Sequence, residues 1–283
     1  MSFTVNTNIG AMAALQSLSA TNKGMATTQS RINTGLSVSS TKDDSASFTI
    51  AQTLRGNLGG LQAVTSSLNR AKSVTDVAVA GAEQISDIVN EMKKKAYEAA
   101  DAGIDQASRD AINQDFVALR NRITTIVNSA DFNGTNLLKS GGGSVSALQS
   151  LQTSGAGSAW VPDSLSVANQ ALGLGGSVVT IASGGQINTQ AAAQAMVNTI
   201  TTTQNNLKTT LSTLGAASRR IDAQLTFTSK LSDVVESGIG NLVDADLAKE
   251  SARLQALQVK QQLGIQALSI ANQAPQAIIS LFR

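Results

Sequence analysis

The chain has 283 residues, a formal net charge of +2, and 42 % apolar but only 3 % aromatic residues. It contains no cysteine and no histidine, which excludes disulfides, thiol nucleophiles, imidazole acid–base catalysis and metal sites built on these ligands. No run of eighteen apolar residues is present, so we expect no transmembrane helix. The first eighteen residues lack a basic start and a continuous apolar stretch, so we also expect no cleavable signal peptide.

The first predicted element is a weakly charged helix near the N-terminus. Residues 1–41 contain only Lys23 and Arg31 as charged side chains. Apolar side chains recur there at seven-residue spacing, which is typical of a helix that packs along one seam. These are Leu18, Met25 and Ile32, with Leu15 and Leu36 beside them.

A long helix is predicted from about Thr41 to about Ala100. We expect Thr41 to cap it and Asp44 to be the capping-box partner. Small and apolar residues then recur at every seventh position, with Leu58, Thr65 and Val79 in the turns between. The seven-residue series is Leu54, Leu61, Leu68, Thr75, Ala82, Val89 and Ala96.

A shorter amphipathic helix follows the "DAG" break at 101–103. Its apolar residues step by 4, 3, 4 and 3, and "DFNG" at 131–134 closes it in a turn because Asn133-Gly134 favours positive φ. The stripe consists of Ile112, Phe116, Leu119, Ile123 and Ile126.

Glycine and serine are abundant in the middle of the chain, at 139–185. Within this insert, "SVVTIAS" (177–183) and "DSLSVAN" (163–169) have the β-branched content of short strands. After it, a second long helix is predicted from about Thr189 to Val235, because the seven-residue spacing returns. That series is Ile200, Leu207, Leu214, Ile221, Thr228, Val235 and Leu242.

These elements together predict a mainly α fold. We expect an elongated helical rod of long coiled-coil helices built from both halves of the chain, plus a small β-containing central insert. The predicted domains are a terminal coiled-coil domain of residues 1–41 and 243–283, and a helical rod domain of residues 42–140 and 189–242. The insert, 141–188, is taken as part of the rod.

The C-terminal segment is apolar on more than one side of its helical pattern. Residues 254–283 carry only Lys260 and Arg283 as charges. A helix of this kind requires neighbours on more than one side, so both ends of the chain are expected to form an assembly interface. The candidate residues are Val5, Ile9, Leu15, Leu18, Met25, Ile32, Leu36, Leu247, Leu254, Leu257, Leu263, Leu268, Ile278 and Phe282.

Catalytic and nucleic-acid functions have little support in the residues. The carboxylate pairs Asp43–Asp44 and Asp244/Asp246 lie at predicted helix starts, where the helix dipole alone favours acidic residues. The run at 93–95 is the only cluster of lysines and is typical of a solvated helix face, and aromatic platforms for bases are missing. We expect no catalytic, cofactor or metal site, no nucleic-acid partner and no membrane partner.

Both ends of the chain carry distinctive short motifs: "VNTNIG" with "RINTG" and "DDSA" near the N-terminus, and "ANQAPQ" with the final "LFR" at the C-terminus. These motifs resemble those at the two ends of bacterial flagellins. "ADFNGTNLL" resembles the turn after the family's second rod helix. The similarity covers about residues 1–140 and 190–283, and the short insert is most like that of compact alphaproteobacterial flagellins.

The resemblance implies a structural subunit that polymerises into the flagellar filament, with the terminal helices pairing within and between subunits. A flagellar hook–filament junction protein is the alternative. The resemblance also implies a secreted protein of the extracellular flagellum, with other copies of itself, an export chaperone, and cap and junction proteins as partners. O-glycosylation is expected on exposed hydroxyls, with Ser177, Thr180, Ser183 and Thr189 as candidates.

Overall fold

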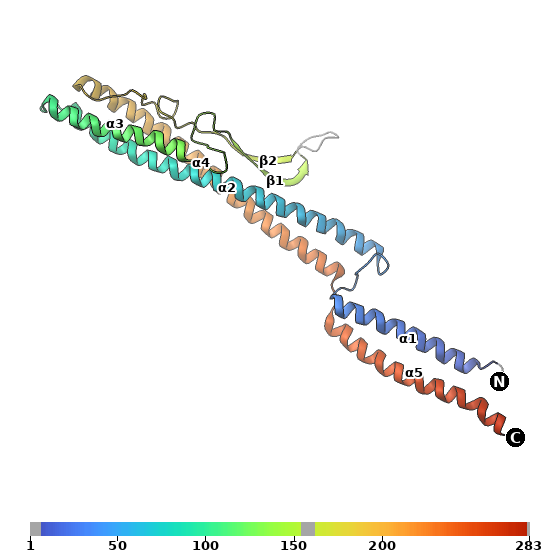
Figure 1. Ribbon diagram of the computed structural model, residues 1–283. Coiled ribbons are helices and arrows are strands. Elements are labelled where there is room, and N and C mark those ends of the chain that lie inside the picture. Colours follow the sequence, from blue (N-terminus) through green and yellow to red (C-terminus); the bar gives the residue numbers. More distant parts are fainter. Residues whose placement is uncertain (1–6, 154–161, 282–283) are drawn as a thin grey trace. The chain divides into compact units, whose positions relative to one another are not determined.

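The computed structural model describes residues 7–153 and 162–281, without the side chains of 152–153 and 274–281. Within this part of the chain the fold is mainly α with a small antiparallel sheet, which confirms the predicted class (Figure 1). The elements are α1 (Ile9–Thr34), α2 (Ser45–Ala100), α3 (Gln106–Ser129), β1 (Val145–Thr153), β2 (Pro162–Val167), α4 (Gln190–Val243) and α5 (Leu247–Leu281).

Internal contacts divide the chain into two compact units, and each combines both halves of the sequence. One unit consists of 1–56 with 234–283, and the other of 57–233. The domain limits expected at residues 41 and 243 remain a prediction.

A continuous stripe of buried residues along α2 in the 57–233 unit alternates in steps of three and four residues, and Ser67, Val74, Gly81 and Ile88 beside it are buried as well. The predicted series Leu61, Leu68, Ala82 and Val89 is buried. The intermediate positions were predicted one residue too late, because α2 buries Val64 and its equivalents while Leu58, Thr65 and Val79 lie at the margin of the stripe. The buried intermediate residues are Val64, Ala71, Ala78, Ile85, Met92 and Ala99.

Helix α4 runs antiparallel to α2 within this unit. Lys72 Nζ lies 2.7 Å from an Asp222 carboxylate oxygen, and Gln204 Nε2 donates to Asn90 Oδ1 at 2.6 Å, so residue numbers fall along α4 as they rise along α2. The predicted seam of α4 is confirmed from residue 200 to residue 228, since its members are buried. These are Ile200, Leu207, Leu214, Ile221 and Thr228.

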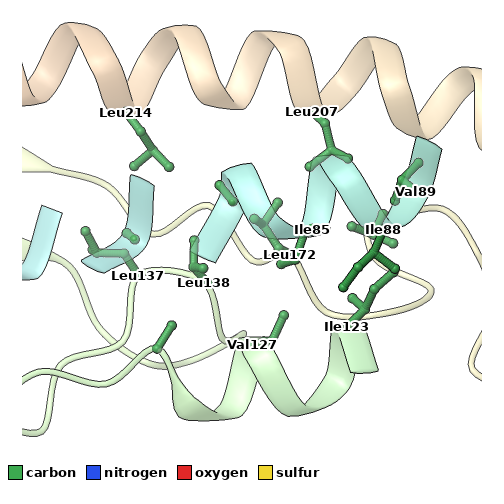
Figure 2. Close-up of a cluster of buried hydrophobic side chains, with 14 of the residues drawn as sticks. Ile85, Ile88, Val89, Ile123, Val127, Leu137, Leu138, Leu172, Leu207 and Leu214 are labelled. Atoms are coloured by element: carbon green, nitrogen blue, oxygen red, sulfur yellow. The ribbon is translucent and has the colours of Figure 1, made fainter. Parts of the chain in front are cut away.

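Helix α3 completes the core beside α2. Phe116 and Ile123 are fully buried, as the amphipathic stripe predicted. Figure 2 shows Ile123 and Val127 of α3 below α2, with Leu207 and Leu214 reaching in from α4 on the other side. The buried Arg109 side chain joins α2 to α3, because its guanidinium donates to the main-chain carbonyls of Ala99 and Asp101.

The insert differs from its prediction in two segments, the first of which is 145–153, where the strand β1 was not predicted. Residues 162–167 form β2, as expected, and pair with β1 from Val145↔Val167 to Leu148↔Ser164. The segment 177–183 is not a strand. Its β-branched residues Val179 and Ile181 are buried in the core, and Thr180 bonds to α4, so burial explains the composition that suggested a strand.

The limits of three helices differ from those predicted. Helix α2 begins at Ser45, because Asp44 and not Thr41 caps it: Asp44 Oδ1 accepts from the amides of Ala46 and Ser47. Helix α4 continues past residue 235 to Val243. A proline inside a helical pattern is expected to kink or end the helix, but α5 does not end at Pro275 and continues to Leu281. The turn at 131–134 is confirmed, with φ of 54° at Asn133 and 80° at Gly134.

Candidate assembly interface

Helices α1 and α5 lie side by side and antiparallel (Figure 1). Three polar contacts define the alignment. Arg31 Nη1 lies 3.1 Å from Glu250 Oε1, Gln261 Nε2 donates to Asn22 Oδ1 at 2.8 Å, and Asn8 Nδ2 donates to the carbonyl of Ala271 at 2.7 Å. We call these two helices the terminal pair.

The seam of the terminal pair has heptad spacing on both helices, as in a coiled coil. The most protected positions alternate in steps of three and four residues, and many are small, which lets the two backbones approach closely. On α1 they are Ala11, Ala14, Leu18, Thr21, Met25, Thr28 and Ile32. On α5 they are Glu250, Leu254, Leu257, Gln261, Gly264, Leu268 and Ala271.

Large apolar side chains remain exposed on the outer faces of the terminal pair. Ile9 is 75 % exposed on α1, and Ile270 is 68 % exposed on α5. The α1 residues line an open groove together with Gln16 and Lys23. The exposed set is Ile9, Met12 and Leu15 on α1, and Leu247, Val259, Leu263, Ile265 and Ile270 on α5. We call this set the outer apolar faces.

The residues predicted for assembly fall into these two groups. Inside the seam lie Leu18, Met25, Ile32, Leu254, Leu257 and Leu268, whereas Ile9, Leu15, Leu247 and Leu263 lie on the outer apolar faces. Leu36 is half-buried in the segment after α1, where it forms a β-bridge with Asp244. Val5, Phe282 and the side chain of Ile278 lie outside the described residues.

Four members of the outer apolar faces were not among the predicted assembly residues: Met12, Val259, Ile265 and Ile270. Met12 lies three residues from both Ile9 and Leu15, and this stripe could have been recognised from the sequence. The C-terminal segment has two apolar lines in its sequence, one through Leu254, Leu257 and Leu268 and the other through Val259, Leu263 and Ile270, and Ile265 belongs to neither. Only the position of α1 along α5 shows that its side chain is left outside the seam.

The candidate carboxylates have structural roles. Asp43 accepts from the hydroxyls and amides of Ser39 and Ser40, and these donors, the Ser39 hydroxyl first, lower the pKa of Asp43. Asp246 caps α5 by accepting from the amides of Ala248 and Lys249 at about 3 Å. No group of three or more acidic residues in the described ranges is arranged to hold a metal ion.

The helices within these same ranges include none that is long and apolar enough to span a lipid bilayer. The terminal helices pair along a seam and leave apolar faces exposed, and the candidate carboxylates serve as helix caps. These features are typical of a class of helical structural proteins that function through protein–protein contacts. Comparisons with known proteins identify the family.

Residues 5–141 match the family model for the bacterial flagellin N-terminal helical region, and residues 186–282 match the one for the C-terminal helical region. The chain belongs to the bacterial flagellin family, and to its alphaproteobacterial type. Flagellin FljM of Caulobacter vibrioides is 44 % identical over 279 residues, covering 99 % of this chain and 98 % of the relative. Flagellin FljK of the same organism is 43 % identical with the same coverage. A flagellin of Brucella melitensis is 36 % identical over 280 residues, covering 98 % of each chain.

The chain is therefore a structural subunit of the bacterial flagellar filament and not an enzyme. It is a component of the flagellum, and its partners include other copies of itself. Nothing in these matches favours the hook–filament junction protein that the sequence left as an alternative.

Proposed function

We propose that the terminal pair is the polymerisation element, and that its outer apolar faces are buried against other copies of this chain. The supporting observation is the exposure of eight large apolar side chains on two adjacent helices. Fully burying one such side chain contributes roughly 1.5–3 kcal/mol, so the set can drive association.

The low charge of the terminal pair supports the same proposal. Lys23 is the only charged residue among those lining the α1 groove, and the α5 residues from 254 to 273 include only Lys260. Copies can therefore pack these helices together without removing many charges from water, which is the costly step in burying polar surfaces. Contacts between unlike faces of successive copies generate an open helical array when the rotation from one copy to the next does not close into a ring.

Two classes of substitution separate pairing within a subunit from packing between subunits. Leu257→Asp and Leu268→Asp place a charge in the seam, so they should open the terminal pair and abolish filaments. Leu263→Asp lies on the outer face, so it should leave the pair formed in the monomer and still abolish filaments. Gln114→Asp adds the same charge at an exposed position of α3, outside the terminal pair, and serves as the control.

Filament formation is measured by electron microscopy after seeding, and pairing by hydrogen exchange of α1 and α5 amides in the monomer. Normal filaments from the Leu263→Asp chain would refute the role of the outer faces. Loss of filaments in the Gln114→Asp chain would show that added charge, and not its position, prevents assembly.

We propose further that the subunit is exported and assembles outside the cell, and that an export chaperone holds its C-terminal segment beforehand. The apolar outer face of α5 supports this, because an unassembled subunit would otherwise expose it in the cytoplasm. Cap and junction proteins of the flagellum would contact the same pair at the filament ends. A pull-down from cytoplasm with and without residues 240–283 tests the chaperone, whose capture should require these residues.

O-glycosylation of the insert and the start of α4 remains our proposal for surface modification. Ser177, Ser183 and Thr189 are exposed, although Thr189 Oγ1 also accepts from the Ala192 amide at the start of α4. Thr180 is the weakest acceptor, because its half-buried hydroxyl lies 2.9 Å from Thr203 Oγ1 and donates to the Thr199 carbonyl. The intact mass of native subunits, measured by mass spectrometry, should exceed 29.0 kDa. A mass equal to that of the unmodified chain would refute the proposal.

A further inference from the structure

The turn between α3 and the insert is a two-residue loop. Phe132 and Thr135 form an isolated β-bridge, in which each amide donates to the carbonyl of the other residue, at 3.0 and 3.1 Å. Asn133 and Gly134 form the loop between them, with φ of 54° and 80°. Both loop residues are exposed. The turn therefore presents an asparagine followed by a glycine to water.

An asparagine followed by a glycine is chemically labile. The glycine nitrogen can attack Cγ of the asparagine side chain, because glycine has no β-carbon to hinder the approach. A bond forms between this nitrogen and Cγ, and the side-chain nitrogen leaves as ammonia with the proton of the attacking amide. Water then opens the resulting five-membered succinimide to aspartate or isoaspartate. Asn133-Gly134 is the one dipeptide of this kind in the sequence, so we expect the reaction at position 133.

A neighbouring carboxylate binds the proton of the attacking nitrogen. The Gly134 amide donates to Asp131 Oδ1 at 3.1 Å. A hydrogen bond to a charged acceptor is stronger than one between neutral groups. The nitrogen must give up this proton in order to attack, so the contact with Asp131 opposes ring closure. Both partners are exposed, so water competes with the contact and its protection is partial.

The conformation of the turn also keeps the reacting atoms apart. Positive φ at both loop residues is the type I′ geometry, in which the first residue occupies the left-handed region and has a positive ψ. This ψ directs Gly134 N away from the Asn133 side chain, whereas the ring requires both on the same side of the main chain. Rotation about ψ would carry Gly134 N away from Asp131 and open the bridge that closes the loop. The carboxylate contact and the turn geometry therefore have to be released together.

Damage at the turn would extend to the core through the residue that follows the bridge. Asn136 is buried, and its Nδ2 donates to the carbonyl of Val127 in α3 at 2.7 Å. Asn136 thus joins α3 to the segment that carries Leu137 and Leu138 into the core (Figure 2). Isoaspartate adds a carbon atom to the main chain, so a two-residue loop containing it cannot close the bridge in the native geometry. Aspartate adds none and tolerates positive φ, so it should leave these contacts intact.

We propose that Asn133 is a deamidation site whose rate Asp131 holds down, and that isoaspartate formed there weakens the core of the 57–233 unit. Water is the co-reactant, so the reaction needs no further reagent. The turn and its contacts lie within the 57–233 unit, so the proposal is independent of the role of the terminal helices in assembly.

Hydroxylamine measures ring closure, because it cleaves the main chain at a succinimide and would here release fragments 1–133 and 134–283. The full-length chain is treated in buffer and, separately, unfolded in guanidinium chloride, and the fragments are followed on gels. We expect cleavage to be at least tenfold slower in the folded chain. Equal rates would overturn the proposal because the turn would then give no protection, and so would the absence of these fragments in both states.

The Asp131→Ala chain tests the carboxylate. Its cleavage should be at least threefold faster than that of the parent when folded and equal to it when unfolded. Asp101→Ala is the matched control, because Asp101 Oδ1 also accepts from a glycine amide, that of Gly103, at 2.9 Å in another loop. The control should cleave at the parent rate. An unchanged rate in the Asp131→Ala chain would overturn the proposal, and a slower one would show that the carboxylate promotes the attack.

The Asp131→Asn chain gives a second measurement should the alanine chain fail to fold, which circular dichroism would show. It keeps the accepting oxygen but not its charge, so its cleavage rate should exceed that of the folded parent and remain at or below that of the alanine chain. A rate equal to that of the parent would overturn the role of the charge.

Ageing of the folded parent in buffer without hydroxylamine tests the effect on the core. Peptide mapping by mass spectrometry locates the conversion, and the other asparagines, none of them followed by glycine, are internal references. Chains that carry isoaspartate at 133, separated by chromatography, should melt at a lower temperature than the parent, whereas the Asn133→Asp chain should melt with it. An isoaspartyl chain that melts with the parent would overturn the effect on the core, and conversion at other asparagines without conversion at 133 would overturn the site.

Discussion

Gly264 of α5 lies directly opposite Leu18 of α1, so close that a β-carbon at 264 would approach Leu18 Cδ1 to 3.3 Å. The contact falls on the end of a flexible side chain, and a single methyl group can therefore be accommodated. A larger side chain would push the helices apart. On α1, Gly24 faces Leu257 of α5, and a β-carbon at position 24 would lie 3.6 Å from Leu257 Cδ2.

Gly264→Leu should accordingly open the terminal pair, whereas Gly264→Ala should change its stability little. Alanine gains roughly 1 kcal/mol of helix propensity over glycine, which offsets the tighter contact, while overpacking by a larger residue typically costs about 1–3 kcal/mol. Hydrogen exchange of α1 and α5 measures the outcome, with Gln266→Leu at an exposed site as the control. Equal protection in the leucine and alanine variants at 264 would contradict the packing.

Removal of residues 1–20 or 264–283 should abolish filaments and leave the 57–233 unit folded. Each deletion removes part of one helix of the terminal pair, whereas the core residues of the other unit are untouched. Thermal melting followed by circular dichroism checks the remaining fold, and electron microscopy checks assembly. A truncated chain that forms normal filaments would show that the terminal pair is dispensable.

Phe116→Ala should destabilise the 57–233 unit far more than Lys72→Ala. Phe116 is fully buried in the core, and removal of such a side chain typically costs about 3–5 kcal/mol. Lys72 pairs with Asp222 at 2.7 Å, but both side chains are about a third or more exposed, and surface ion pairs are worth roughly 0–1 kcal/mol. Denaturant unfolding of the two variants gives the comparison, and similar losses in both would contradict it.

The loop before α2, which contains Ser39, Ser40 and Asp43, should lose its structure in acid. Hydroxyl and amide donors of Ser39 and Ser40 lower the pKa of Asp43 from the ordinary 3.8. A carboxyl group whose pKa is lowered by folding stabilises the fold above its ordinary pKa, and this contribution disappears as the pH falls through the lowered value. Between pH 7 and 4 the loop should therefore stay unchanged.

Amide chemical shifts of Ser39 and Ser40 can follow this transition by nuclear magnetic resonance. They should titrate with a midpoint below 3.8, and the Asp43→Asn chain should show no such step. A midpoint at or above 3.8 would mean that the carboxylate does not accept these hydrogen bonds in solution.

Much of the helical core could be predicted from local pattern. Seven-residue spacing identified Leu61, Leu68 and Val89 of α2 and Ile200 of α4 as buried, because a helix that packs along another repeats its contacts every two turns. The Asn133-Gly134 turn was also predictable, since positive φ at two successive residues is a local property of the backbone.

Only the tertiary structure determined which of several chemically similar residues are buried or paired. Leu15 and Leu18 are both apolar positions of one helix, yet Leu15 is exposed and Leu18 lies in the seam, because the position of α5 and not the α1 sequence determines which face is covered. Val179 and Ile181 suggested a strand but pack into the helical core. Arg31 and Glu250 are 219 residues apart, and only folding brings their charges together. The physical reason is common to all three cases: periodicity determines which side chains share a face, but burial of that face depends on a partner that is remote in the chain.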